Sequence, residues 1–341
     1  MGLTPRRLLS WLEGRKMPRC AIVTLGWLGL SALVLLGLVA SPVARGQEAG
    51  EWFVVREALN LRAAPSTEAA VLTVLPAGAR VEALGPSEGL WLPVRYGSYS
   101  GYAVHTYLAP APTGRYSVDL PVPFRRQLTA VWCDPAVIQS WYEYATGQPV
   151  ADSYAFQAAT WEWEASHNLG FTLEEWNASP YAVASALHHH MPDRGFNHWK
   201  SDDPVVATRV LAWFLAHPAF RQPAIALIWR GAHYVLVRGV EAEGDPYRDY
   251  PAAVIRGVYV LDPNQGDRTW LGIDRYIPLA EWTRDYLTPV SYLTPHTGVP
   301  GDQWQGKYVT ILADWQVGPP LEAGRTPADL DAYIAAGERA P

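Results

Sequence analysis

The chain has 341 residues, 49% of them hydrophobic, which is enough for two domains that each bury a core. Residues 1–46 hold six Lys or Arg but only Glu13 as an acid, so setting them aside deepens the net charge from −6 to −11. An acidic body argues against nucleic-acid binding and against a basic surface that would attract a membrane.

Residues 1–46 are expected to be an export segment rather than part of a fold. Basic residues between Arg6 and Arg19 precede the uncharged run from Ala21 to Ala40, which is the order found in signal peptides. Cleavage would release a chain that begins near Gln47, whereas an uncleaved run of about 20 apolar residues is long enough to span a bilayer. Both outcomes predict an extracytoplasmic protein, secreted or anchored, whose membrane contact is limited to this segment.

Residues 50–110 are predicted to form a small all-β barrel, because short Val-, Leu- and Tyr-rich segments alternate with Pro- and Gly-containing turns. The expected strands are 54–61, 70–75, 80–84 and 90–96.

The same region resembles a bacterial SH3-like domain. LNLRAAPS (59–66), LPAGARV (75–81) and GYAVHTYL (101–108) are similar to the opening strand, middle hairpin and closing strand of that family. The resemblance implies a domain that tethers an envelope enzyme to cell-wall peptide or glycan. A spacer that binds nothing is the alternative.

A short linker, 111–116, is predicted from its Pro and Gly content. A second domain is expected over 117–315, followed by a C-terminal tail, 316–341. Thr326 and Pro327 are suited to the N-cap and first position of a short helix in that tail, and Gly337 to its end.

Cys133 is the one cysteine outside the export segment, since the only other, Cys20, lies at the edge of that segment. A thiol without a disulfide partner in an exported chain is either incidental or reactive. Asp134 and Pro135 predict the start of a helix, with Asp134 as its cap and Gly147 as its stop. The positive end of such a helix is expected to lower the pKa of the thiol and favour the thiolate. A buried cysteine packed on Trp132 is the structural alternative.

His233 and Asp262 lie on two predicted strands of one meander. Strands are expected over 224–230, 233–240 and 254–261, and the turn over 244–250 sets residue 233 opposite residue 262. The carboxylate would then orient the imidazole, as in a nucleophile–base–acid triad. Asn264 and Gln265 follow Asp262, where they either complete the site or form a turn.

Gln127 lies six residues before Cys133, a spacing that would bring its amide beside the Cys133 backbone N–H to form an oxyanion hole. Gln, Cys, His and Asp in this order are the residue set of a papain-type thiol hydrolase.

These blocks resemble the stand-alone, secreted relatives of the double-glycine, or bacteriocin-processing, cysteine peptidases within the papain-like superfamily. The matching residues are Gln127 with Cys133-x-Pro-Ala, the strand AHYVLVxG (232–239) and VLDP (260–263). The resemblance implies Cys133 as nucleophile, His233 as base, Asp262 as orienting acid and Gln127 in the oxyanion hole. It also implies a nucleophile helix packed on an antiparallel sheet.

One departure from that family concerns activity. Many members have Gly after the cysteine, where this chain has Asp134. A carboxylate beside the thiol opposes its ionisation, unless Asp134 caps the helix and points away.

Two competing signals carry less weight. His188, His189 and His190, with His198, would suggest a metal, but three consecutive residues cannot face one way on a helix. The helix expected over 179–187 would leave its histidine end solvated, so neither a metal nor a cofactor is predicted.

Acids and tryptophans share one stretch of the sequence, and paired carboxylates beside aromatic rings can signal glycoside hydrolysis. They are Glu162, Glu164, Glu174, Glu175, Trp161, Trp163 and Trp176. A sugar- or peptide-binding wall above the cysteine cleft, or ordinary packing, explains them as well.

Together these features predict an all-β SH3-like barrel followed by an α+β papain-like domain. The leading hypothesis is an exported cysteine peptidase or amidase that hydrolyses peptide or isopeptide bonds of a peptide or peptidoglycan-type substrate. The alternatives are a non-catalytic envelope-binding protein with a papain-like shell, and a transglutaminase-like acyl transferase.

Overall fold

The computed structural model describes residues 49–169, 178–264, 275–291 and 303–337. The predicted export segment, 1–46, lies outside the described residues, as does Cys20. Within the described ranges, no helix combines the length and the apolarity needed to cross a membrane.

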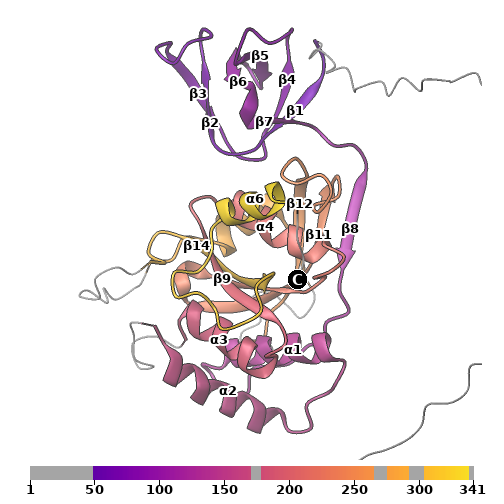
Figure 1. Cartoon of the computed structure of the whole chain (residues 1–341), viewed down its shortest axis with the longest axis vertical. Helices are drawn as coiled ribbons and strands as arrows, with labels where there is room; N and C mark the ends of the chain where they lie inside the picture. Colours follow the sequence, from indigo (N-terminus) through magenta and orange to yellow (C-terminus); the bar gives the residue numbers. More distant parts are fainter. Residues whose placement is uncertain (1–48, 170–177, 265–274, 292–302, 338–341) are drawn as a thin grey trace, which may run out of the picture. The chain divides into compact units, whose positions relative to one another are not determined.

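The N-terminal region is an antiparallel sheet of seven strands in the order β3-β2-β6-β5-β4-β1-β7 (Figure 1). The strands are β1 (Trp52–Val55), β2 (Leu59–Arg62), β3 (Val71–Leu75), β4 (Arg80–Ala83), β5 (Trp91–Tyr96), β6 (Tyr99–Val104) and β7 (Leu108–Pro110). Alternate residues of these strands form a core of their own, which includes Phe53, Leu61, Val81, Leu92 and Ala103. Alternation of buried and exposed positions is what a sheet with one core-facing side requires.

Two details of this sheet differ from the sequence prediction. The strand expected over 54–61 is two strands, β1 and β2. The segment 101–108, which resembles a closing strand, divides between β6 and β7, because a 3-10 turn at His105–Tyr107 separates them. Gly101 lies within β6. Gly101 is required there, since a Cβ at this position would lie 2.5 Å from the carbonyl oxygen of Arg62 on β2.

The C-terminal region is a mixed α/β unit built on a second antiparallel sheet. Its main path runs β13-β12-β11-β10-β14-β9, and β8 pairs with β11. The strands are β8 (Arg115–Asp119), β9 (Gly195–Ser201), β10 (Ala224–Ile228), β11 (His233–Glu243), β12 (Val254–Leu261), β13 (Arg275–Pro278) and β14 (Tyr308–Asp314). Arg115 and Tyr116, expected in the linker, are therefore part of this sheet.

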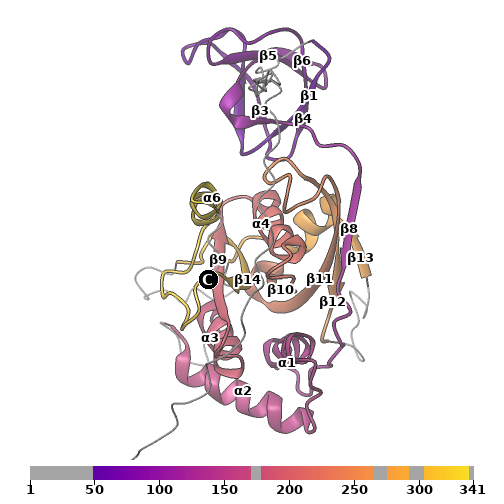
Figure 2. The same cartoon turned by 45° about the vertical axis from the view of Figure 1, so that its right-hand side comes forward.

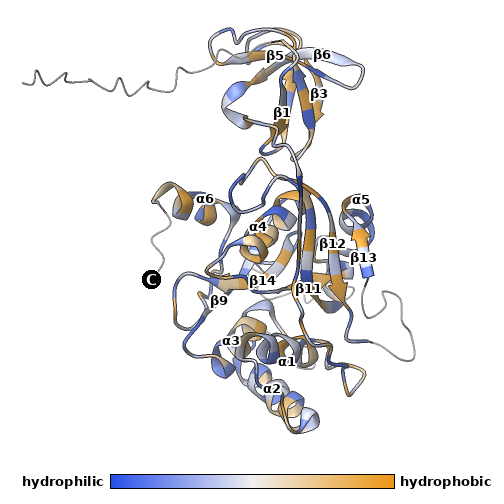
Figure 3. Cartoon of the chain, turned by 90° about the vertical axis from the view of Figure 1, so that its right-hand side faces the viewer, coloured by the Kyte–Doolittle hydropathy of each residue, from blue (hydrophilic) through white to orange (hydrophobic). Residues whose placement is uncertain are grey.

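Helices cover the central strands of this second sheet. They are α1 (Cys133–Thr146), α2 (Ser153–His167), α3 (Pro180–His190), α4 (Pro204–Ala216), the short α5 (Leu279–Glu281) with a π-helical turn (Trp282–Tyr286), and α6 (Pro327–Ala335). Every residue of β10 is buried and nearly every residue of β9 and β14, so both faces of the sheet are covered. α1 packs on β11, α3 on β9 and β14, and α2 on α1 and α3 (Figures 1 and 2). Apolar colouring follows the strands and α4, which packs across them (Figure 3).

Residues beyond β14 pack against this unit rather than extending from it. The Arg325 guanidinium donates to both carboxylate oxygens of Asp314, at 2.5 and 2.9 Å, and the Trp315 and Tyr333 rings stack at 4.1 Å. Thr326 and Asp329 form the capping box of α6, which confirms the predicted start of that helix.

Candidate functional site

Cys133 is the first residue of α1, so the predicted position of the thiol at a helix N-terminus is confirmed. The helix ends where expected, because Gly147 adopts a left-handed conformation (φ 68°) and its N–H donates to Glu143 O. The Cys133 side chain is buried, with 5% of the residue exposed.

The prediction that Asp134 caps this helix is wrong. Trp132 occupies the N-cap and provides no side-chain hydrogen bond, while Asp134 lies inside the first turn, fully buried. Its Oδ1 accepts the S–H of Cys133 at a distance of 3.6 Å. Burial, and then the Asp134 carboxylate, raise the pKa of Cys133 well above its usual value, although the backbone N–H of Tyr234 lowers it. The helix terminus alone therefore does not produce the thiolate that the sequence suggested.

Glu164 of α2 completes a buried pair of acids with Asp134. Both side chains have no exposed surface, and their carboxyl groups are hydrogen-bonded to each other. Both oxygens of Glu164 and Oδ2 of Asp134 lack an N–H or O–H donor among the described residues. Burial raises the pKa of Asp134 to about 6 and raises that of Glu164 well above its usual value. The hydrogen bond between the two carboxyl groups requires that at least one of them carry a proton, since an ionised carboxylate only accepts.

The sequence did contain a signal for Glu164 as an interior residue. Gln157, Thr160 and Glu164 recur at three- and four-residue spacing along α2, and all three are fully buried. A polar stripe at helical spacing that faces inward indicates a polar network, which the emphasis on neighbouring tryptophans obscured.

His233 and Asp262 are hydrogen-bonded, with 2.8 Å between Nε2 and Oδ1, and both are buried. Because an ionised carboxylate only accepts, Nε2 carries the proton and Nδ1 keeps a free lone pair. Asp262 Oδ1 also accepts the backbone N–H of Asn264 at 2.9 Å, so the backbone of Asn264 helps to fix the carboxylate. Gln265 lies outside the described residues.

The backbone register differs from the prediction although the side chains meet. The β11–β12 ladder pairs Leu236 with Leu261, so residue 262 is offset by two positions from His233. The offset is already present beside the turn, where Glu243 pairs with Val254, because the register shifts at Glu241/Ala242 and Val237/Gly239 cancel each other.

Tyr234 links the thiol to the imidazole. It follows His233 on β11, its backbone N–H is directed at the Cys133 sulfur, and its hydroxyl donates to Ala178 O at 2.9 Å. Cys133 of α1 and Asp262 therefore contact adjacent residues of β11, Tyr234 and His233.

The turn before His233 is strained. Trp229, Arg230 and Gly231 have φ values of 51°, 64° and 94°, in the region that disfavours side chains. The indole of Trp229 stacks on the His233 imidazole, with 5.3 Å between centroids and 15° between planes. Such strain persists where surrounding contacts fix the conformation, and it clusters at functional sites.

Two hydroxyl groups hold that strained turn in place. The Arg230 N–H donates to Thr288 Oγ1 at 2.9 Å, and its Nε and Nη2 donate to Ser291 Oγ at 2.8 and 2.6 Å. Because the turn is held in this way, the stacked indole of Trp229 restricts rotation of the His233 ring.

Gln127 is buried, precedes α1 in the chain and contacts the segment that follows β12. Its backbone N–H donates to Pro263 O at 3.0 Å, and its Nε2 donates to Thr129 O at 2.9 Å. Its Oε1 has no donor partner among the described residues. An oxyanion role would have to use the second Nε2 hydrogen, since the first is already engaged.

Gln157, which sequence reasoning missed, fixes the backbone on both sides of Gln127. Its Oε1 accepts the N–H of Leu128 at 3.1 Å, and its Nε2 donates to Arg126 O and to Gln139 Oε1, each at 3.0 Å. Because the Gln157 side chain is fully buried and both its oxygen and its nitrogen are hydrogen-bonded, it holds the backbone of residues 126–128 in one conformation.

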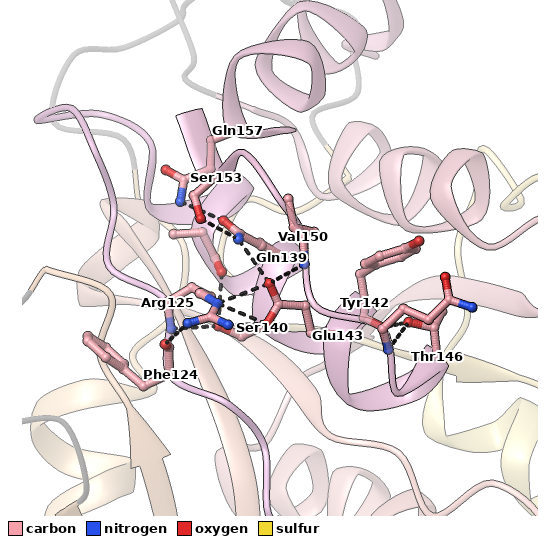
Figure 4. Close-up of polar contacts among 12 residues, drawn as sticks. Phe124, Arg125, Gln139, Ser140, Tyr142, Glu143, Thr146, Val150, Ser153 and Gln157 are labelled. Atoms are coloured by element: carbon pink, nitrogen blue, oxygen red, sulfur yellow. Dashed lines mark hydrogen bonds and ion pairs between the residues drawn. The ribbon is translucent and has the colours of Figure 1, made fainter. Parts of the chain in front are cut away.

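An ion pair attaches the start of the same loop to α1 (Figure 4). Arg125 Nε and Nη2 reach the Glu143 carboxylate at 2.6–3.0 Å, and Gln139 Nε2 donates to Glu143 Oε1 at 3.0 Å. Burial opposes ionisation of Glu143, but the hydrogen bonds from Arg125 outweigh it, so the pKa of Glu143 is lowered. The loop that carries Gln127 is thus attached to the nucleophile helix.

The histidine-rich region is only partly solvated: His189 is exposed, whereas His190 and His198 are packed. His190 Nε2 lies 2.8 Å from Thr160 Oγ1, and burial lowers the pKa of His190 to about 4. His198 accepts from Trp304 Nε1 at 3.1 Å, and its burial lowers its pKa to about 3. Among the described residues, no group of three or more His, Cys, Asp or Glu is arranged to hold a metal.

The acid and tryptophan cluster does not form one surface. Glu162 is exposed, whereas Glu164 is interior, and Glu174, Glu175 and Trp176 lie outside the described residues. Trp163 is stacked between His167 and His189 at 4.0 and 3.7 Å.

Three solved structures show low similarity to this chain. A double-glycine-motif protease from an AMS/PCAT transporter, in complex with its leader peptide, is 13% identical with a TM-score of 0.32, over 60% of this chain and 98% of that one. NlpC1 from Trichomonas vaginalis is 8% identical with a TM-score of 0.17, over 68% of this chain and 65% of that one. NlpC2 from the same organism is 11% identical with a TM-score of 0.17, over 67% of this chain and 71% of that one. These scores are too low to support a functional assignment.

No curated protein matched the chain. One family model did, that of the bacterial SH3 domain, over residues 57–109. This range covers β2 to β6 and most of β7. Residues 57–109 are therefore a bacterial SH3 domain, in agreement with the resemblance seen in the sequence.

Proposed function

We propose that the α/β unit is a papain-like thiol hydrolase, a cysteine peptidase or amidase. The observation that carries the proposal is the junction of α1 and β11. Cys133, at the first position of α1, receives the backbone N–H of Tyr234, the residue after His233, and His233 is bonded to Asp262. These contacts support the assignment of Cys133 as nucleophile, His233 as base and Asp262 as orienting acid.

The proposed reaction is acyl transfer to sulfur. His233 Nδ1 accepts the thiol proton while Cys133 Sγ attacks the carbonyl carbon, and the imidazolium then protonates the leaving amine. Asp262 keeps the Nε2–H tautomer and stabilises the imidazolium. Water, deprotonated by His233, hydrolyses the thioester. The second Nε2 hydrogen of Gln127 and the Cys133 N–H would stabilise the oxyanion.

The substrate class and location belong to the same proposal. An SH3 domain of the bacterial type beside a thiol hydrolase suits peptide or isopeptide bonds of cell-envelope material. This assignment places the protein outside the cytoplasm, delivered by residues 1–46. The domain arrangement proposed is an SH3 domain over 50–110, a linker over 111–114 and a hydrolase domain that begins with β8 and includes the residues packed on it after β14.

A second candidate is a non-catalytic envelope-binding protein with the same shell. The contact between Asp134 and Cys133 favours it, because this contact raises the pKa of the nucleophile. Binding would then involve the SH3 domain, while Cys133 would only fill space.

The test uses purified peptidoglycan fragments and follows new amino groups by mass spectrometry. The hydrolase proposal expects products from the parent protein and none from Cys133→Ala. Equal product formation by both proteins would exclude Cys133 as the nucleophile. Binding that survives Cys133→Ala, with no turnover by the parent, would support the binding protein.

A further inference from the structure

A buried pair of acids contacts the proposed nucleophile, and the hydrolytic mechanism above does not use it. Asp134 Oδ1 lies 3.6 Å from Cys133 Sγ, and the Asp134 carboxyl group is also hydrogen-bonded to that of Glu164. Acids at such a position oppose the thiolate that the mechanism requires, so their presence needs a reason.

The contacts of this pair set a minimum for its proton count. No N–H or O–H donor within the described residues reaches either oxygen of Glu164 or Oδ2 of Asp134. Two ionised carboxylates cannot hydrogen-bond each other, because neither has a hydrogen to donate. The contact therefore requires at least one proton, and the pair carries a single negative charge with one proton and none with two.

Few other titratable groups face the pair. Cys133 on α1 and His233 on β11 are the further groups that act on Asp134. From α3, which packs on both helices, His188, His189 and His190 contact Arg194 O, Trp163 and Thr160 instead. On α2 itself, Glu162 is exposed to solvent and His167 stacks on Trp163.

We propose that Asp134 and Glu164 form a protonation switch for the nucleophile. A single negative charge on Asp134 holds Cys133 as a thiol, and uptake of a second proton by the pair allows Cys133 to ionise toward His233. This inference rests on the proposed function, because it describes how that site is regulated.

The proton balance of the switch is simple. On acidification a solvent proton adds to the Asp134 carboxylate, so the pair becomes neutral and the negative charge that opposed ionisation of Cys133 is removed. The S–H proton then passes to His233 Nδ1, which gives a thiolate and an imidazolium. The new O–H of Asp134 is placed to donate to the thiolate. Burial raises the pKa of Asp134 to about 6, which sets the transition in mildly acidic solution.

Glu164 determines where the charge resides. As the neutral member it donates a hydrogen bond to Asp134 and stabilises the ionised form of that residue. A side chain that donates in the same way preserves the switch, whereas an apolar one makes Asp134 take up its proton at higher pH.

The test measures Cys133 reactivity in the full chain carrying Cys20→Ser, which leaves one thiol. Iodoacetamide labelling is followed by intact mass from about pH 5 to about pH 8.5, a range below the usual thiol pKa. At neutral pH we expect Asp134→Asn to label at least about tenfold faster than the parent, since a like charge in contact shifts a pKa by roughly one to three units. The two rates should converge near the acidic limit.

Substitutions at Glu164 test the pair rather than Asp134 alone. Glu164→Gln keeps a donor and should retain the parent profile, whereas Glu164→Leu should label faster at neutral pH. Glu162→Gln, on the exposed side of the same helix, is the matched control and should match the parent. Equal profiles for the parent and Asp134→Asn, slower labelling of Asp134→Asn, or equal effects of Gln and Leu at Glu164 would each overturn the proposal.

An infrared measurement on the parent keeps the proposal testable if a variant does not fold. The parent at neutral pH should show the C=O stretch of a buried protonated carboxylic acid, and the absence of that band would overturn the switch. The reactivity test is separate from the hydrolysis test. If the parent shows the pH-dependent labelling but cleaves no substrate, the hydrolase proposal fails. If the protein is an active hydrolase but the parent and Asp134→Asn label at the same rate, the switch fails.

Discussion

Replacing Asp134 by Asn should stabilise the protein at neutral pH, although Asp134 is fully buried and lies in the site. Burial raises the pKa of Asp134 from 3.8 to about 6. The stability that this group contributes is fully present below pH 3.8, the unfolded value, and is lost as the pH rises through about 6. An upward shift of about two units, at 1.36 kcal/mol per unit, corresponds to about 3 kcal/mol lost between acidic and neutral solution.

Asn is neutral at every pH and keeps an oxygen that can accept from Glu164. The free energy of unfolding of Asp134→Asn should therefore equal that of the parent near about pH 4 and exceed it by about 3 kcal/mol near neutral pH. Urea denaturation at a series of pH values measures this difference, with Glu162→Gln as the control. If the free energy of unfolding changes with pH in the same way for the parent and Asp134→Asn, ionisation of Asp134 does not destabilise the folded protein, and the reasoning is refuted.

Three further predictions concern the surroundings of the site. Gln157→Met should cost about 3 kcal/mol of unfolding free energy, because three hydrogen bonds of about 1 kcal/mol each are lost, and urea denaturation checks it. Asp262→Asn should lower kcat/KM by about a hundredfold or more, because an amide does not hold the Nε2–H tautomer of His233. Circular dichroism should show an intact fold, and an unchanged kcat/KM would exclude Asp262 from the reaction. Trp229→Ala should broaden the NMR signals of the His233 ring, because the stacked indole is removed; unaltered signals would show that the stack does not restrain the ring.

Local sequence patterns predicted those elements whose signals are local. The position of Cys133 at a helix N-terminus, the end of that helix at Gly147 and the capping of α6 by Thr326 depend on a few adjacent residues, and all three are confirmed, although the predicted cap at Asp134 is wrong. The SH3 domain was recognised for the same reason, since its three landmark segments are short and contiguous.

Features that depend on tertiary contacts were not predictable in this way. The orientation of Asp134 is determined by Glu164, thirty residues away on another helix, and an N-cap rule has no access to that contact. The thiol pKa was misjudged because burial outweighs the helix end, and burial is a property of the packed domain. The backbone register of β11 and β12 depends on where the two strands leave their turn, with Glu243 opposite Val254, and the composition of the turn does not fix that point.

The most direct test of the central claim is the effect of His233 on the reactivity of Cys133 in the folded chain carrying Cys20→Ser. The iodoacetamide labelling rate near about pH 5.5, well below the usual thiol pKa, is compared between the parent and His233→Ala. The account predicts measurable labelling of the parent and a rate at least about tenfold lower in His233→Ala, because the thiolate depends on the imidazole. Labelling of the parent only after unfolding, or equal rates in both proteins, would contradict the account and favour the binding protein.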